Sequence, residues 1–237
     1  MSPSASCAAC AAETEDDDLR RVHDVVRSGE QAKLADLLVQ RADVNIRFSG
    51  DTPLHWAVAA GAQAMLQQLL DAQADPNIVD RKGKTPLRRA YDDEIAARSL
   101  LIARAEPDFQ DKNGESALHC AAEVGRDDVA VLLLDARANP NLTNDELATP
   151  LHNASAFGMP SVVDVLVSAR ANLNAKDQNG NTSLHHAVCG GHADVCSRLL
   201  HLGIDASAEN LAGETARRCA EQVGTAEVRA VFFEFPD

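Results

Sequence analysis

The sequence is poor in aromatic residues and has no long apolar segment. Only 3% of its 237 residues are aromatic, although 45% are hydrophobic. The core must therefore consist mainly of alanine, leucine and valine, and such small side chains favour closely packed helices. The longest apolar runs, such as residues 129–134, have the length of a buried helix segment and are too short to cross a bilayer. We therefore expect no membrane insertion.

Positive charge is also scarce. The chain has 22 lysine and arginine residues against 36 aspartate and glutamate residues, which gives a formal net charge of -14 at pH 7. A protein with this excess of negative charge repels the phosphate backbone of nucleic acids. The composition therefore disfavours a general nucleic-acid-binding function, and a protein is the expected partner.

No targeting or lipid-attachment pattern is visible. The first residues lack the basic and apolar stretches of a secretory signal, and the myristoylation and prenylation patterns are absent. Six cysteines are scattered along the chain, at Cys7, Cys10, Cys120, Cys189, Cys196 and Cys219. This usage fits a reducing compartment. We expect an intracellular, cytoplasmic protein, with the nucleus as the alternative.

The sequence contains no motif of a common enzyme class. A phosphate-binding loop, a GxSxG nucleophile, an HExxH metal site and the protein-kinase motifs are all missing. We therefore predict a protein without catalytic residues or a cofactor.

What the sequence does contain is an internal repeat. A threonine or serine begins six related strings, TPLHWA, TPLRRA, SALHCA, TPLHNA, TSLHHA and TARRCA, at Thr52, Thr85, Ser116, Thr149, Thr182 and Thr215. An apolar doublet follows each string at a nearly fixed distance, as in Leu69–Leu70 and Leu133–Leu134. Residues 19–45 carry a matching doublet without the Thr-Pro pair. A period of this length indicates stacked supersecondary units.

These strings resemble the ankyrin repeat family, whose period of 33 residues and T-P-L-H-x-A pattern they follow. The resemblance implies an all-α, curved solenoid of stacked helix-turn-helix repeats with hairpin or loop fingers between them. It also implies about seven repeats including the caps. We predict a monomer. The predicted organisation is a disordered tail over 1–17 and one repeat domain over 18–237, with repeats at 18–49, 50–82, 83–113, 114–146, 147–179, 180–212 and 213–237.

The repeat also makes physical sense. The threonine hydroxyl can cap a helix whose first residue is proline. Asp80, Asp111 and Asp177 each stand three residues before a glycine, which is a turn-forming spacing. Glycines that suit a left-handed helix end occur at Gly61, Gly125, Gly158, Gly191 and Gly224. The doublets, including Phe232–Phe233, are expected to pack in the core, whereas Phe235 either covers the last repeat or contacts a partner.

The histidines and cysteines allow a metal-site hypothesis, which we consider the weaker interpretation. In the family, the motif histidine makes hydrogen bonds between repeats, and His55, His119, His152 and His185 occupy that place. A zinc site, and with it a metal-dependent enzyme, could be built from His185, His186, Cys189, His192 and Cys196. A buried cysteine used as a small apolar side chain is the simpler reading of Cys196. Cys7 and Cys10 form a lone CxxC pair, and whether they are modified stays open.

The resemblance implies that partners bind on the concave surface formed by the fingers and the first helices. Arg81, Lys82 and Lys84 form a basic finger, followed by Arg88 and Arg89, and Asp145 and Glu146 make a later finger acidic. Phe48 and Phe157 are the expected apolar anchors. The residues predicted to contact a partner are Phe48, Asp51, Arg81, Lys82, Lys84, Arg88, Arg89, Asp92, Asp93, Lys112, Glu115, Asp145, Glu146, Phe157 and Asn181.

Two further features invite interpretation. Leu147 stands where other fingers have glycine, which predicts either a distorted turn or an exposed apolar contact. The resemblance also implies that Asn45, Asn77, Asn141 and Asn174 could be substrates of an asparaginyl hydroxylase. The predicted function is a non-catalytic scaffold or adaptor, and the alternative within the same fold is a regulatory or targeting subunit, or an inhibitor, of one enzyme.

Overall fold

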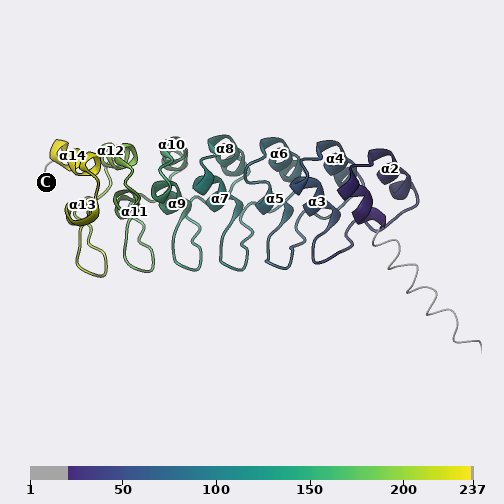
Figure 1. Ribbon diagram of the computed structural model, residues 1–237, viewed down its shortest axis with the longest axis horizontal. Helices are drawn as coiled ribbons and strands as arrows, with labels where there is room; N and C mark the ends of the chain where they lie inside the picture. The colour runs from purple at the N-terminus through teal and green to yellow at the C-terminus, as the bar shows by residue number, and fades with distance from the viewer. Residues whose placement is uncertain (1–20, 236–237) are drawn as a thin grey trace, which may run out of the picture. The chain divides into compact units, whose positions relative to one another are not determined.

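The computed structural model describes residues 21–235, and they form helix pairs joined by long loops (Figure 1). The chain divides after Glu106 into two compact bodies, which we describe separately as the N-terminal body, residues 21–106, and the C-terminal body, residues 107–235. Within residues 21–235, β-structure is limited to isolated bridges such as Phe48 with Asp51. The all-α class is confirmed, while the continuity of one array over residues 18–237 stays a prediction.

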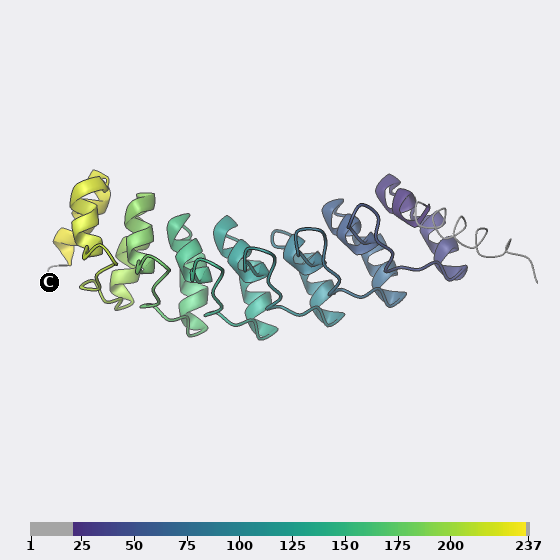
Figure 2. The same cartoon turned by 90° about the horizontal axis from the view of Figure 1, so that it is seen from below.

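The N-terminal body consists of three helix pairs. Residues 21–28 are helical and pair with α2 (Gln31–Val39). The second pair is α3 (Pro53–Ala59) with α4 (Gln63–Asp71), and the third is α5 (Pro86–Arg89) with α6 (Glu94–Ile102). Helix α3 packs against α5, and α4 packs against both α2 and α6. The first helices therefore form one layer and the second helices another (Figure 1), and Figure 2 shows the helix pairs of this body from the finger side.

The C-terminal body repeats this plan in four pairs. They are α7 (Ala117–Val124) with α8 (Asp127–Asp135), α9 (Pro150–Ala156) with α10 (Pro160–Ser168), α11 (Ser183–Gly190) with α12 (Ala193–His201), and α13 (Ala216–Val223) with α14 (Ala226–Glu234). The odd-numbered helices pack against one another, as do the even-numbered helices. In each body the loops between pairs, which we call fingers, project from the side of the first helices (Figure 1).

In four repeats the motif histidine forms a bridge to the following repeat. In the second pair, the backbone N–H of Thr52 donates to Nδ1 of His55 at 3.2 Å, and Nε2 of His55 lies 2.9 Å from the carbonyl oxygen of Lys84, in the following repeat. His119, His152 and His185 make the same two contacts, with the carbonyls of Ala148, Asn181 and Glu214. The neutral tautomer with a proton on Nε2 satisfies both bonds. Both ring nitrogens of these histidines are thus engaged in hydrogen bonds that hold the fold together.

Asparagines near the ends of the repeats provide a second link. The side-chain oxygen of Asn45 accepts the backbone N–H of Asp75 at 2.8 Å, and that of Asn77 accepts the N–H of Glu106 at 2.8 Å. Asn141 and Asn174 do the same for Asn172 and Asp205 in the C-terminal body. Each of these bonds satisfies a loop N–H that the helices leave without a partner.

Leucines of both helix layers form the core. Leu54 and Leu87 of the first helices, and Leu69 and Leu100 of the second, are at most 1% exposed. Burying one such side chain contributes about 1.5–3 kcal/mol. The second residue of each doublet lies at the flank of its helix, where Leu70 is only half-buried.

The last pair departs from two predictions. Phe232 is buried, but Phe233 is 84% exposed, so the prediction that both pack in the core is wrong for Phe233. It occupies the flank position of the doublet on α14, the last described helix. Gly224 has a φ of -66°, so it is not the left-handed helix end that we expected, because Thr225 already caps α14 in an extended conformation.

Candidate protein-binding surface

The fingers are held rigid by a side chain at their base. Oδ1 of Asp80 accepts the backbone N–H groups of Lys82 and Lys84 at 2.7 and 2.9 Å. Asp111, Asn144, Asp177 and Asn210 accept the equivalent pairs of N–H groups in the C-terminal body. The predicted turn at the aspartates is therefore present, and two asparagines serve the same purpose. Side chains at the finger tips are thereby presented on a fixed backbone.

Neighbouring fingers of the C-terminal body are also bonded to one another. The backbone N–H of Asp145 donates to the carbonyl of Asn113 at 3.1 Å, that of Gln178 to Glu146 at 2.8 Å, and that of Leu211 to Asn179 at 2.9 Å. This ladder places Lys112, Asp145 and Glu146 in exposed positions. Glu115 and Asn181 are less available to a partner. The side-chain amide of Asn144 in the next finger donates to Glu115, and that of Asn210 donates to Asn181.

The structure corrects the expected role of Arg88 and Arg89. Arg88 occupies the place of the motif histidine and is only 7% exposed. Arg89 donates to Asp80 and to Asp51, with its closest contact at 2.6 Å in each case. Neither arginine therefore belongs to the exposed basic finger. Asp51 is likewise engaged with Arg89 rather than available to a partner.

The electrostatics of this cluster agree with its geometry. Burial alone would lower the pKa of Arg89, but hydrogen bonds to Asp80 and Asp51 outweigh burial and raise it. For Asp80, burial would raise the pKa, yet the hydrogen bonds from Arg89 and from the backbone N–H groups of Lys84 and Lys82 lower it. Arg89 and Asp80 are thus held charged and paired.

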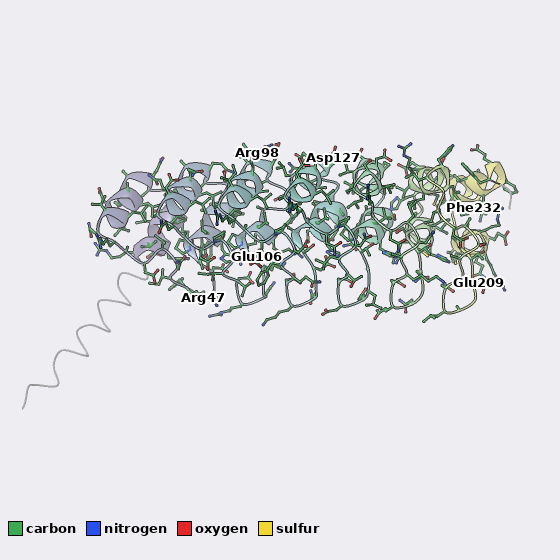
Figure 3. All side chains as sticks on the ribbon, turned by 180° about the vertical axis from the view of Figure 1, so that it is seen from behind. Arg47, Arg98, Glu106, Asp127, Glu209 and Phe232 are labelled. Carbon is green, nitrogen blue, oxygen red and sulfur yellow. The ribbon has the colours of Figure 1, made fainter. Side chains whose placement is uncertain are left out.

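Four cations on the fingers of the N-terminal body have no such partners among the described residues. Arg47, Arg81, Lys82 and Lys84 form no ion pair or side-chain hydrogen bond with any residue between 21 and 235. Arg47 belongs to the finger 46–51 and the other three to the finger 78–84. In Figure 3, Arg47 lies on the finger side of its body, whereas Arg98 lies on the side of the second helices. We call these four residues the basic ridge.

Phe48 is only partly the exposed anchor that we predicted. Its finger is one residue shorter than the next, so Phe48 stands at the base, where other fingers have aspartate or asparagine, and its N–H bonds to the carbonyl of Asp51 at 2.9 Å. The half-buried ring lies 4.4 Å from the ring of His23, which in turn lies 4.7 Å from the ring of Trp56. Trp56 is a surface candidate that the sequence reasoning missed, although it is the sole tryptophan of an aromatic-poor chain.

Phe157 and Leu147 are the exposed apolar side chains that were expected in the C-terminal body. Phe157 is 50% exposed and Leu147 is 52% exposed. Leu147 has a φ of 58°, the left-handed conformation that glycine adopts in the other fingers. The turn is therefore of the ordinary type, and the exposed side chain costs some backbone strain.

The two aspartates after Tyr91 have different roles. Asp93 caps α6, because its Oδ1 accepts the N–H of Ala96 at 3.0 Å and its Oδ2 accepts the side-chain amide of Gln63 at 2.8 Å. Asp92 is exposed. The repeat that lacks two residues therefore begins its second helix with a side-chain cap, and Asp93 has a structural role that we did not predict.

The residues of the hypothetical zinc site have separate partners. His185 bonds to the carbonyl of Glu214, His186 to Asp177 at 2.9 Å, and His192 to the carbonyl of Ala156 at 3.0 Å. Cys196 is fully buried, and burial raises the pKa of its thiol to about 12. Over residues 21–235, no group of three or more potential metal ligands converges. Cys7 and Cys10 lie outside the described residues.

The repeats, their fingers and their histidine bridges define the fold, and the comparisons with known proteins agree. The sequence model of ankyrin repeats in three copies matches residues 22–96, 91–177 and 129–210. The chain belongs to the ankyrin repeat family. An ankyrin repeat domain is a protein-interaction domain, and the family is generally non-catalytic.

Solved structures support the same fold. The ankyrin repeat domain of Bcl-3, described as a unique member of the IkappaB protein family, has a TM-score of 0.79 and 24% identity over 90% of this chain and 97% of that one. The human ASB11 ankyrin repeat domain has a TM-score of 0.79 and 24% identity over 91% and 97%. No curated protein sequence is significantly similar to this chain. At such identities the likeness concerns the fold and selects no partner.

None of the helices within residues 21–235 has both the length and the apolar character needed to pass through a bilayer.

Proposed function

We propose that this ankyrin repeat protein is a non-catalytic scaffold or adaptor that binds a partner protein through its finger tips and first helices. The observation that carries the proposal is that different side chains of each repeat have different roles. The threonine, the histidine and the finger-base aspartate or asparagine bond to their own chain, whereas the finger tips vary in charge and stay exposed. A rigid frame that presents variable side chains is the arrangement that repeat proteins use for recognition.

The histidine chemistry supports a binding role rather than catalysis. Burial is the largest influence on the pKa of His55 and His185 and lowers both, although their bonds to backbone carbonyls oppose the change. Each ring is held neutral between a backbone N–H of its own repeat and a backbone carbonyl of the next repeat. A general base needs a free nitrogen within reach of a substrate, and these rings offer none.

The experiment is affinity capture with mass spectrometry, using the tagged full chain and two variants of equal net charge. The finger variant carries Arg81→Glu, Lys82→Glu, Asp145→Lys and Glu146→Lys. The control variant carries Lys33→Glu, Arg98→Glu, Asp71→Lys and Asp135→Lys, all exposed on the second helices. Circular dichroism verifies that all three proteins are folded.

We expect specific partners of the unmodified chain to be lost by the finger variant and retained by the control variant. Loss in the control variant alone would move the binding surface to the second helices and overturn the proposal. A chain that captures no specific protein would overturn it as well. One dominant enzyme, bound in a fixed stoichiometry, would favour the regulatory-subunit alternative over a scaffold.

A further inference from the structure

The basic ridge is an isolated positive surface in an acidic protein. Arg47, Arg81 and Lys82 are exposed and Lys84 is half-exposed, on two consecutive fingers of one body. The formal net charge of the whole chain is -14. In the C-terminal body the exposed finger residues include the acids Asp145, Glu146 and Glu209 beside the cations Lys112 and Lys176. The ridge is therefore a group of cations whose sign is opposite to the net charge of the chain.

The nearby acids do not neutralise the ridge. Asp51 and Asp80 both bond to Arg89, and Asp80 also accepts two backbone N–H groups. These three side chains form a partly buried cluster beneath the fingers, with side-chain exposures of 18% for Asp51, 4% for Asp80 and 25% for Arg89. Two carboxylates and one guanidinium group leave this cluster with one net negative charge, so the cluster and the four ridge cations together carry a net charge of about +3 that is available to an external partner.

Arg81 is positioned by its neighbour Gly50. A Cβ atom at Gly50 would lie 2.2 Å from Cγ of Arg81, so the aliphatic stem of Arg81 lies directly on the Gly50 backbone. Packing of the stem and of Nε restrains the side chain and joins the two fingers, although Arg81 as a whole stays exposed. A restrained guanidinium group binds carboxylates with little further loss of entropy, often through two parallel hydrogen bonds.

An aromatic surface adjoins the ridge. Phe48 lies two residues before Gly50, and His23 connects its ring to that of Trp56. The guanidinium carbon of Arg27 lies 5.9 Å from the centre of the Trp56 ring. Phe48 and Trp56 are both half-buried, so part of each ring remains accessible. Aromatic and arginine side chains supply much of the binding energy at protein interfaces.

We propose that the basic ridge and the Phe48–Trp56 pair form one docking site for an acidic protein segment. Carboxylates of the segment pair with Arg81, Lys82 and their neighbours, and one apolar side chain packs on the aromatic pair. This inference rests on the proposed function and specifies the chemistry of the partner.

The overall charge favours a peptide over a nucleic acid. Four cations can pair with a short acidic segment, whereas a long phosphate backbone would extend into the negative field of the remaining chain. Asp92, which is exposed in the same body, adds to that repulsion.

The single tryptophan, Trp56, lies at the proposed site, so its fluorescence can report peptide binding there. The full chain is titrated at low salt with a synthetic peptide of about 12 residues, about 40 Å when extended, that contains aspartate, glutamate and one central phenylalanine. Trp56 fluorescence monitors binding. A peptide with glycine in place of the phenylalanine, and a short duplex DNA, are titrated in parallel.

Two charge-reversal variants of equal net charge complete the design. Arg81→Glu with Lys82→Glu removes half of the ridge, and Lys112→Glu with Lys176→Glu changes two exposed finger cations of the C-terminal body. We expect the first variant to weaken peptide binding at least about tenfold and the second to change it less than about twofold. The glycine peptide should bind the unmodified chain about fivefold more weakly.

Several outcomes would overturn the proposal. Equal weakening by both variants would place binding elsewhere, and absence of saturation up to about 1 mM peptide would exclude the site. Tighter binding of the DNA would identify the ridge as a phosphate-binding surface. Any of these results would leave the scaffold function standing if the capture experiment still finds partners that depend on the finger variant.

Discussion

Arg81 and Arg89, which are eight residues apart in the sequence, have opposite roles in this protein. Arg81 is exposed and carries no ion pair within the described residues, whereas Arg89 joins Asp51 and Asp80 beneath the fingers. Residue type alone does not separate them. What separates them is whether a carboxylate lies within reach in the fold, and this decides between a recognition role and a structural one.

Replacing Arg89 should therefore destabilise the protein far more than replacing Arg81. Arg89→Gln leaves the carboxylate of Asp80, whose side chain is 4% exposed, without its charged partner, which we expect to cost about 3 kcal/mol. Arg81→Gln should change stability by less than about 0.5 kcal/mol. Urea denaturation of both variants measures the difference. Equal stability of the two variants would show that the Arg89 cluster makes no net contribution to the free energy of unfolding.

The bridging histidines should also make stability depend on pH. Burial, followed by repulsion from His186, lowers the pKa of His152 to about 4 from an ordinary value of 6.5. Below pH 6.5 the unfolded chain therefore binds a proton that the folded chain does not. The corresponding stability is fully present above pH 6.5 and falls as the pH drops toward 4, by about 2 kcal/mol between pH 7 and pH 5.

The variant His152→Gln isolates this contribution. It can keep polar contacts at the site but cannot titrate, so its urea midpoint should fall less between pH 7 and pH 5 than that of the unmodified protein. Parallel pH profiles for the two proteins would contradict the assignment.

At the scale of elements, each repeat is a helix pair whose ends are specified by single side chains. Thr85 caps α5 through the N–H of Arg88 at 3.1 Å, and Asp93 caps α6. The repeat at 83–113 lacks two residues between its helices, and α5 is only four residues long. It still stacks, because Leu87 and Leu100 remain buried in the core.

The capping role of Asp93 can be tested by comparing an alanine substitution there with one at Asp92. Asp93→Ala removes the bonds to Ala96 and Gln63 and should lower the free energy of unfolding by about 1 kcal/mol. Asp92→Ala, at the exposed neighbouring position that does not cap α6, should lower it by less. Thermal unfolding followed by circular dichroism provides the measurement, and similar losses for both variants would argue against a capping role.

At the scale of the molecule, the repeats within each body contact their sequence neighbours. Each body is therefore a row of similar helix pairs. At the end of the C-terminal body, Arg217 donates to the carbonyls of Phe232 at 2.9 Å and Phe235 at 2.5 Å, and the ring of Phe235 lies 4.8 Å from that of His201. Phe235 therefore contacts its own chain, which favours the covering role over the partner-binding one. Function in such an array resides in the finger surfaces, because the frame is shared with many unrelated proteins.

The sequence by itself determined the period, the helix pairs, the buried leucines and the bridging role of the histidines. These features are local or recur at a fixed spacing, so six similar strings specify them redundantly. The tertiary structure decided which surface residues are free. Arg89 reaches Asp51 across 38 residues, Phe48 turns inward in a shortened finger, and Phe233 stays exposed on the last described helix. Each outcome depends on which neighbouring repeat supplies a carboxylate, a ring or a covering helix, and that contact exists only after the repeats have stacked.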